Sequence, residues 1–331
     1  MMRLTVALLI ACGPFAAACG TAVAQQNVAA TWPSNWPSKP IHAVVPLAPG
    51  TGGDVMARLM LNQLAQQLGQ SIVIENKGGA GGTLGVAQVA KSDPDGYTLL
   101  AHSSTHVIAP SMYTNLPYDT ANDFAGVMPI GSVPSALVIA PSKGIKDLKD
   151  FVAKAKAAPG GFTYASAGVG STTHLTAERF RLSAGFPVVH VPFRGGGFQP
   201  EIMAGRVDFG YSPIATSLPN IKEGRLQAIA VSSPQRAAAL PDVPTTLEAG
   251  YANSDYVIWM GLFLPAKTPR PIVEKLNQEM RKAWQNPALR ERFVGLDVTP
   301  MPMTPAEFDA LIKKEIADNA VLAKAAGLKP N

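Results

Sequence analysis

Cysteine is almost absent from this sequence of 331 residues. The only two, Cys12 and Cys19, lie near its start. A fold that begins beyond them has no disulfide framework and no cysteine nucleophile. Charged residues are also scarce, at 15%, whereas hydrophobic residues make up 47%. This composition excludes a disordered chain and a coiled coil, and it predicts a globular protein that relies on core packing.

Long apolar runs and dense basic runs are missing beyond the first residues. No later stretch approaches the ~20 apolar residues that a membrane span needs. The 28 Lys and Arg residues give a formal net charge of +5, but they are scattered and no basic run is interleaved with aromatic residues. We therefore expect no nucleic-acid partner, and a small anion suits the mild positive charge better.

Motifs for common cofactors and metals are missing as well. The five histidines show no spacing such as H-E-x-x-H. Residues 50–53 do not form the G-x-G-x-x-G fingerprint of a dinucleotide site, and residues 78–82 lack the Lys-Ser/Thr of a P-loop. We expect neither a cofactor nor a metal ion.

The N-terminal residues have the pattern of a secretory signal. Arg3 precedes an apolar run over residues 4–18, and Ala22-Val23-Ala24 offers small residues for cleavage. We expect residues 1–24 to be a signal peptide and the mature protein to be free in the periplasm. A lipoprotein is the alternative, because the residues before Cys12 and Cys19 loosely resemble a lipoprotein cleavage box.

Strand-like and helix-like segments alternate after this leader. The apolar spacing predicts strands at 41–46, 71–75, 97–101, 135–140, 162–165, 188–191, 207–211, 226–231 and 259–265, and helices at 54–68, 84–90, 146–157, 172–184, 199–204, 217–222, 271–284, 287–293 and 305–325. Alternating elements of this kind indicate an α/β protein whose sheets are mostly parallel and flanked by helices.

The chain length and the element order predict two lobes. The C-terminal helices need a sheet to cover, and the first one is available, so the chain should cross between lobes near 136–140 and 258–264. We expect residues 38–137 plus 262–331 in lobe 1 and residues 138–261 in lobe 2. The two crossing strands would form a hinge that lets the lobes close on a ligand.

Small and hydroxyl-bearing residues gather in loops that follow predicted strands. In open α/β sheets, ligands bind at the carboxyl ends of strands, where helix N-termini offer unpaired N–H groups. The loops at residues 46–54, 103–106 and 167–174 could each hold a carboxylate in this way. They contain Ser103, Ser104, Thr105 and Ser171, and Ser212 is a secondary candidate at the same sheet edge.

Three nearby side chains each have two interpretations. Asp54 either caps the following helix, which is the commoner use, or accepts N–H bonds from its loop. Arg194 either clamps an anionic group or pairs with a carboxylate across the cleft. His174 and Ser171 suggest a base and a nucleophile, but no G-x-S-x-G elbow accompanies them, so a helix-surface or interdomain histidine is favoured.

Several segments occur in an order that is specific to one family. Residues 36–41, 44–46, 49–54, 75–82, 164–175, 191–195, 205–208 and 240–245 resemble the Bug family, the substrate-binding proteins of tripartite tricarboxylate transporters. The resemblance covers essentially the whole chain after the leader. It implies a type II periplasmic binding-protein fold that closes on a small carboxylate and delivers it to a membrane permease, without catalysis.

The resemblance also implies which loop residues bind the carboxylate. These are Ala48, Gly50, Thr51, Gly52, Gly53 and Asp54 in the first loop and Gly168, Gly170, Ser171, Thr172 and Thr173 in the later one. The first loop departs from the family pattern, since Leu47 stands where an aromatic residue is frequent.

The identity of the carboxylate stays open among di- and tricarboxylic, amino and aromatic acids. We expect a monomer. The competing functions are a periplasmic hydrolase, using Ser171 or Ser103 with His174 or His106, and a ligand-binding partner of a membrane sensor.

Overall fold

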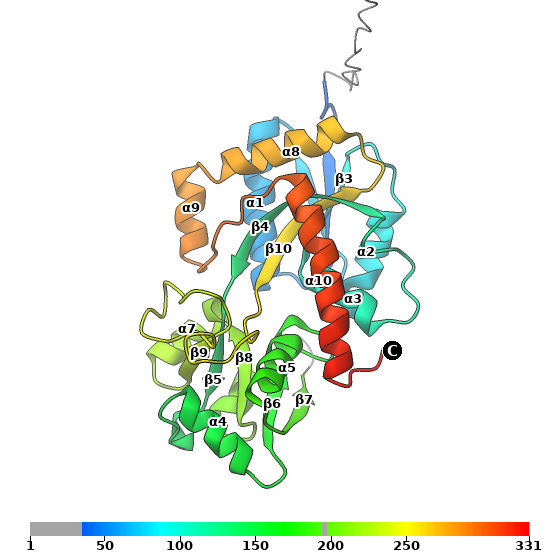
Figure 1. Cartoon of the computed structure of the whole chain (residues 1–331). Coiled ribbons are helices and arrows are strands. Elements are labelled where there is room, and N and C mark those ends of the chain that lie inside the picture. The colour runs from blue at the N-terminus through cyan, green and yellow to red at the C-terminus, as the bar shows by residue number, and fades with distance from the viewer. Residues whose placement is uncertain (1–34, 194–196, 331) are drawn as a thin grey trace, which may run out of the picture. The chain divides into compact units, whose positions relative to one another are not determined.

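Two separate five-stranded sheets organise the computed structural model, which describes residues 35–193 and 197–330 (Figure 1). The first sheet has the strand order β2-β1-β3-β10-β4, and the second has the order β7-β6-β8-β5-β9. The two-lobed α/β fold expected from the sequence is confirmed. The expected signal peptide at residues 1–24 and the residue Arg194 lie outside the described residues.

Both ends of the chain build the first sheet. Its strands are β1 (Ile41–Val45), β2 (Ile72–Asn76), β3 (Thr98–Ser103), β4 (Phe124–Val133) and β10 (Ile258–Pro265). The accompanying helices are α1 (Gly52–Leu68), η1 (Ala80–Gly82), α2 (Thr83–Ala90), α3 (Thr105–Met112), α8 (Arg270–Ala283), α9 (Pro287–Val294) and α10 (Pro305–Ala325). The strand β4 and the helix α3 were not among the elements expected from the sequence.

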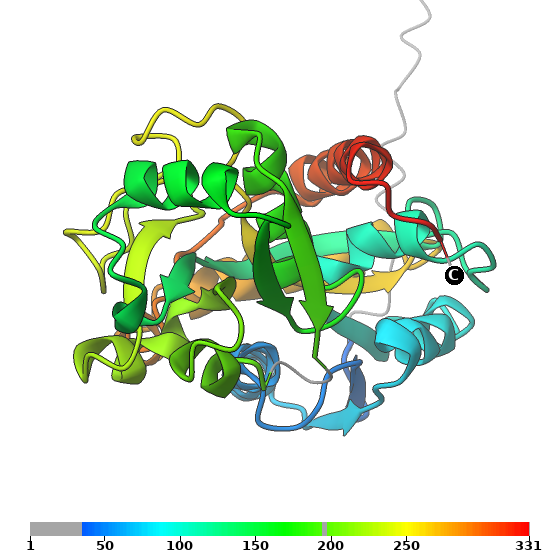
Figure 2. The same cartoon turned by 90° about the horizontal axis from the view of Figure 1, so that it is seen from below.

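The middle of the chain builds the second sheet. Its strands are β5 (Ser135–Ile139), β6 (Phe162–Ser166), β7 (Val188–Pro192), β8 (Phe209–Pro213) and β9 (Gln227–Val231). Its helices are η2 (Pro141–Lys143), α4 (Leu148–Ala157), α5 (Thr172–Ala184), α6 (Gln199–Met203) and α7 (Ile214–Lys222). Figure 2 shows the green helices α4 and α5 on one side of this sheet and the yellow-green α7 on the other.

The sheets are mixed, whereas the sequence predicted mostly parallel ones. In the first sheet β1 pairs parallel with β2 and β3, but β10 pairs antiparallel with β3 and β4. In the second sheet β6 pairs parallel with β7 and β8, but β5 pairs antiparallel with β8 and β9. The antiparallel pairings arise because β5 and β10 enter a sheet from the other sheet instead of through a βα unit.

The crossings between the sheets differ slightly from the expected hinge. The strand β4 leads into β5 through Pro134 alone, and β5 and β10 each lie wholly within one sheet. The lobe boundaries predicted at 137/138 and 261/262 therefore fall inside these two strands. We propose instead that the lobes divide at Pro134 and near Val257.

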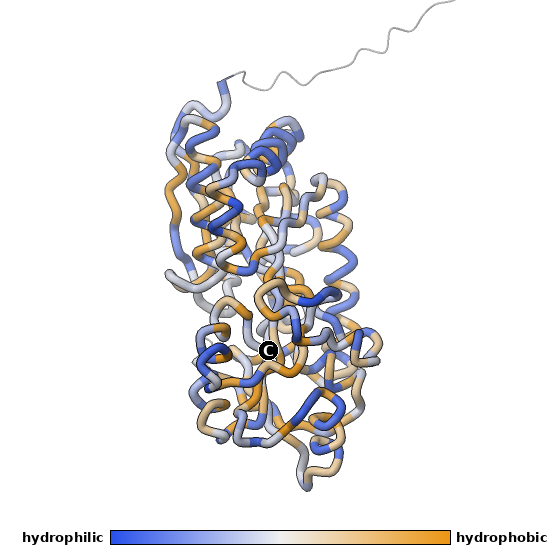
Figure 3. Tube along the Cα trace, turned by 90° about the vertical axis from the view of Figure 1, so that its left-hand side faces the viewer, coloured by the Kyte–Doolittle hydropathy of each residue, from blue (hydrophilic) through white to orange (hydrophobic). Residues whose placement is uncertain are grey.

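Each sheet has an apolar core on both faces. In β1, Val45 belongs to the cluster under α1 and α8, whereas its neighbour Val44 belongs to the cluster that contains Phe308 of α10. This alternation is the period-two pattern of a strand buried on both sides. Hydrophilic and hydrophobic segments alternate along the helices in the hydropathy trace, as expected for helices with one face on a core (Figure 3). Among the described residues, no helix is both long and apolar enough to cross a bilayer.

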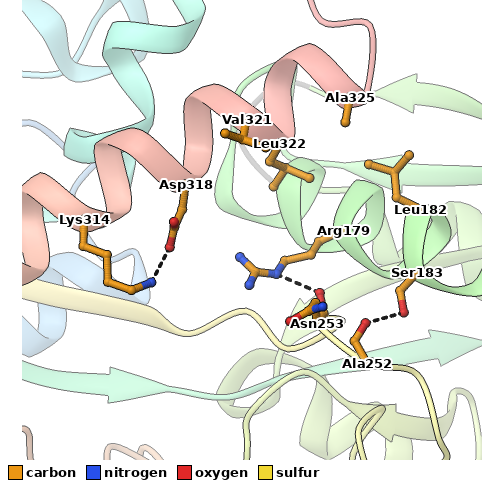
Figure 4. Close-up of a pocket in the computed structure, with 10 residues that line it drawn as sticks. All are labelled: Arg179, Leu182, Ser183, Ala252, Asn253, Lys314, Asp318, Val321, Leu322 and Ala325. Carbon is orange, nitrogen blue, oxygen red and sulfur yellow. Dashed lines mark hydrogen bonds and ion pairs between the residues drawn. The ribbon is translucent and has the colours of Figure 1, made fainter.

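The C-terminal helix α10 packs against elements from both halves of the fold. It contacts α3 and α5, and Asn319 on α10 accepts a hydrogen bond of 3.2 Å from the hydroxyl of Tyr256. Figure 4 shows the surface hollow between α10 and α5, where Arg179 donates to the carbonyl of Asn253 at 3.0 Å. The helix therefore ties the first sheet to the segment that precedes β10.

A carboxyl group on α10 is held at this junction. The Nε1–H of Trp259 donates to Glu315 at 2.9 Å. Burial raises the pKa of Glu315 from 4.5 to about 7, although this hydrogen bond opposes the increase. Because the unfolded chain loses this proton near pH 4.5, the contribution of Glu315 to stability is complete below that pH and is lost as the pH rises towards 7.

Replacing Glu315 with glutamine should remove this pH dependence. Gln can still accept the Trp259 hydrogen bond but does not titrate. We expect Glu315→Gln to gain stability over the wild type as the pH rises from 4.5 to 7, on the order of 1–3 kcal/mol at the upper end. Urea denaturation across this range measures the difference. A difference that stays constant with pH would contradict the assignment.

Candidate functional site

Loops from both sheets line one cavity of about 440 Å³. Ten of the residues predicted from the sequence are in its lining, namely Gly50, Thr51, Gly52, Gly53, Ser103, Thr105, Ser171, Thr172, Thr173 and Ser212. Five others, Ala48, Asp54, Ser104, Gly168 and Gly170, lie beside the lining residues in the chain without reaching the cavity themselves. Arg194, as stated, is outside the described residues.

The first loop presents the N-terminus of α1 to the cavity. Thr51 is the N-cap, and its hydroxyl accepts from the N–H of Asp54 and donates to the carbonyl of Ala48 at 2.9 Å. The N–H groups of Gly52 and Gly53 then occupy the first helical turn, where no intrahelical acceptor exists. Gly53 also allows close packing, because a Cβ atom there would lie 2.6 Å from Cδ1 of Leu47.

Asp54 stabilises the conformation of this loop through buried hydrogen bonds. Its carboxylate is 1% exposed and accepts hydrogen bonds from the N–H of Gly50 (2.9 Å), from Arg58 (2.9 Å) and from Asn76 (2.7 Å). Burial alone would raise the pKa of Asp54, but these hydrogen bonds lower it below its ordinary value. The capping role favoured from the sequence is therefore wrong. Thr51 caps the helix, and Asp54 orients the loop.

The second loop joins β3 to α3 and places hydroxyl groups at the cavity. The Ser103 hydroxyl donates to that of Thr105 at 3.0 Å. The Ser104 side chain turns away from the cavity and is fully buried, with no hydrogen-bond partner among the described residues. Both ring nitrogens of His106 are likewise buried without a described partner, so His106 is not paired with Ser103 as a base.

The third loop joins β6 to α5 and is held by side chains of its own. Ser171 is the N-cap of α5, and the Thr173 hydroxyl accepts from the N–H of Ala167 at 3.0 Å. His174 is buried, and its Nδ1 accepts from the N–H of Gly170 at 3.0 Å. The ring lacks a proton on Nδ1, so it is neutral.

Aromatic packing fixes His174 in this state. Its ring stacks on that of His190 with centroids 4.0 Å apart, and the ring of Tyr164 stacks near both, with its centroid 4.7 Å from that of His190 and 6.1 Å from that of His174. Burial, assisted by His190 and Arg181, lowers the pKa of His174 to about 3. His174 thus shapes the loop. Its Nδ1 is used by Gly170 and the Ser171 hydroxyl contacts Thr173 and the backbone N–H of His174, an arrangement that does not fit the hydrolase alternative.

The fourth contribution comes from the junction of β8 and α7, which the sequence analysis largely missed. Gln199 donates to the hydroxyl of Ser212 at 2.9 Å, and its own amide oxygen accepts from Asn220 at 2.8 Å. Thr216 lines the cavity from the first turn of α7. A polar residue at the start of a helix after a strand is the signal that could have indicated Gln199.

An apolar wall completes the cavity, and the sequence analysis did not anticipate it either. It consists of Leu47, Met56, Val133, Ile258, Met260, Leu296, Val298 and Phe198, with smaller residues between them. No acidic, basic or histidine side chain is among the described lining residues. Across the described residues no cluster of three or more His, Cys, Asp or Glu side chains could hold a metal ion.

Two α/β lobes with helix N-termini facing one cavity, whose described lining residues are uncharged, define the class of two-lobed substrate-binding proteins. The profile of the tripartite tricarboxylate transporter family receptor matches residues 56–328, and the chain belongs to this family. Its members are periplasmic substrate-binding proteins and not enzymes.

Solved structures share the fold over nearly the whole chain. The periplasmic binding protein BugD is 30% identical, with a TM-score of 0.77 over 89% of this chain and 100% of its own. MatC from Rhodopseudomonas palustris with bound malate is 32% identical, with a TM-score of 0.76 over 86% of this chain and 99% of its own. Rpa4515 from R. palustris with adipate is 29% identical, with a TM-score of 0.80 over 89% of this chain and 100% of its own.

The buried carboxylate of Asp54 should be essential for the stability of the first loop. Asp54→Ala removes three hydrogen bonds and leaves the Gly50 N–H and Asn76 without their acceptor, so we expect a loss of about 2–4 kcal/mol in the free energy of unfolding. Asp150→Ala is the matched control, because Asp150 also pairs with a cation four residues later but has 27% of its side chain exposed, against 2% for Asp54. Urea denaturation should show a far smaller effect for the control. Equal effects would contradict the anchoring role.

Proposed function

We propose that this protein captures a small carboxylate in the cavity between its sheets and delivers it to the permease of a tripartite tricarboxylate transporter. The bound relatives MatC and Rpa4515 carry malate and adipate, which are both small carboxylates. The single observation that best supports the proposal in this chain is the arrangement of α1, α3, α5 and α7, all of which begin at the cavity.

The chemistry of the lining suits a carboxylate. Helix N-termini offer N–H donors and a partial positive charge, which together stabilise an anion without a cationic side chain. The hydroxyls of Ser171, Thr172 and Thr173 add donors from the second sheet. The remaining site residues predicted from the sequence would act indirectly, because Asp54 and Gly170 belong to the hydrogen bonds that hold the loops. Arg194 remains a proposed contact for an anionic group.

Family membership supports the proposed route of the ligand. A periplasmic location agrees with family membership, and we propose that residues 1–24 direct export and leave a free, monomeric protein. Such a protein needs a separate membrane component to carry its ligand into the cell.

Gly52 gives a direct test of carboxylate binding through backbone N–H groups. It is the first helical residue, a Cβ atom there meets nothing within 4 Å, and Thr51 before it is already extended (φ −67°, ψ 156°). Proline fits this position and removes only the N–H. We expect Gly52→Pro to lower the affinity for every carboxylate about ten-fold, because one charge-assisted hydrogen bond is lost. Gly52→Ala keeps the N–H and should lower the affinity much less.

Calorimetry on both variants, with a panel of mono-, di- and tricarboxylates, measures this difference. Thermal unfolding first establishes that each variant is folded. If Gly52→Pro binds the panel as tightly as Gly52→Ala, the N–H of Gly52 does not hold the ligand.

Uptake experiments test the partner. Deleting the cognate permease should abolish uptake of the radiolabelled ligand while the purified receptor keeps its affinity. Uptake that persists in a strain with no other permease for the ligand would refute the coupling. Normal uptake combined with loss of a ligand-induced transcriptional response on deleting the receptor would instead indicate the sensor function.

A further inference from the structure

The cavity has a polar side and an apolar side. The four helix-leading loops supply the polar side. The apolar side comes chiefly from Met56 on α1, Ile258 and Met260 on β10, and Val298 after α9, with Leu47 beside them. This division bears on which carboxylate the site accepts.

The apolar side is the end of the core of the first sheet. Met56, Met260 and Val298 belong to that core cluster and are 2%, 2% and 5% exposed, respectively. Ile258 and Met260 are two residues apart on β10 and so lie on the same face of the strand. A wall of this kind is fixed by packing on its far side, and its surface offers a ligand neither a hydrogen-bond donor nor a charge.

The two described charges beneath the first loop are already paired. Asp54 and Arg58 pair with each other at 2.9 Å below the first loop, and neither lines the cavity. A carboxylate at the polar side has N–H and hydroxyl donors. A second carboxylate placed against Met56 and Met260 would lose its hydration without any described counterion, which is strongly unfavourable.

We propose that the ligand of this receptor is a monocarboxylate with an apolar body, and that Leu47, Met56 and Met260 determine this specificity. This inference rests on the proposed function and narrows it. The carboxylate lies at the helix N-termini and the hydrocarbon part covers the wall. The preference differs from that of MatC and Rpa4515, whose bound ligands are the dicarboxylates malate and adipate.

Calorimetry with monoacids and their corresponding diacids tests the proposal. The pairs are hexanoate with adipate and benzoate with terephthalate, and hexanamide serves as the uncharged analogue. We expect each monoacid to bind at least about ten-fold more tightly than its diacid. A diacid that binds as tightly as its monoacid overturns the inference but leaves the proposed function intact. If no acid of a broad panel binds, or if hexanamide equals hexanoate, the proposed function itself fails.

A charge placed on the wall should reverse the preference. Leu47→Arg supplies a counterion for a second carboxylate, so we expect the ratio of adipate to hexanoate affinity to rise at least about ten-fold. Leu84→Arg adds the same charge at a position that is 56% exposed and outside the cavity lining, and it should leave the ratio unchanged. An equal rise in both variants would show that net charge, not the wall, sets the preference, which overturns the inference.

Arg194→Ala completes the set, because Arg194 is the basic residue that sequence analysis assigned to the site. The preference for monoacids should persist in this variant. If the wild type binds diacids tightly and Arg194→Ala alone loses that affinity, Arg194 is the counterion and the inference is wrong. The wild-type panel decides the question even if a variant fails to fold.

Discussion

The structure depends on one constraint at the loops that line the cavity. Each loop must keep a fixed shape, and it must also leave some of its backbone N–H groups without a protein acceptor so that they can bind the ligand. Side chains beneath the loops meet this constraint. Asp54 binds the first loop through the N–H of Gly50, and in the third loop His174 and Thr173 accept the N–H groups of Gly170 and Ala167. The loops are therefore organised before any ligand arrives, which lowers the entropic cost of binding.

The connection between the sheets is also short. The strand β4 passes into β5 through a single residue, Pro134, and β10 returns beside β4 with Ile258 opposite Val133. These two strands bring residues of the crossing segments directly to the cavity. Helix α10 braces the back of β10 through Trp259 and Glu315. Val133 on β4 and Ile258 on β10 line the cavity, so the crossing strands also form part of the cavity wall.

The sequence was sufficient to predict local features but not features assembled from distant segments. Strand–loop–helix units are local patterns, and the loop residues at the cavity followed from their position after a strand. The strand β4 was missed because Gly126, Pro129 and Gly131 interrupt its pattern, and the pairing of Pro129 with Gly261 lies beside a bulge. Helix α3 was missed because it contains Pro110. The apolar wall joins residues 47, 56, 258–260 and 296–298, and no local pattern links them.

The described part of the cavity lining carries no charged side chain, and this has a kinetic consequence. A carboxylate held by a buried arginine dissociates slowly, because breaking such a contact leaves two bare charges. Hydrogen bonds from N–H groups at helix ends leave only neutral donors behind, and these donors are rehydrated as soon as water enters. A receptor of this design can hold a carboxylate tightly while it is closed and still release it quickly once the cavity opens. Such a receptor can be emptied and reused many times without any input of energy of its own.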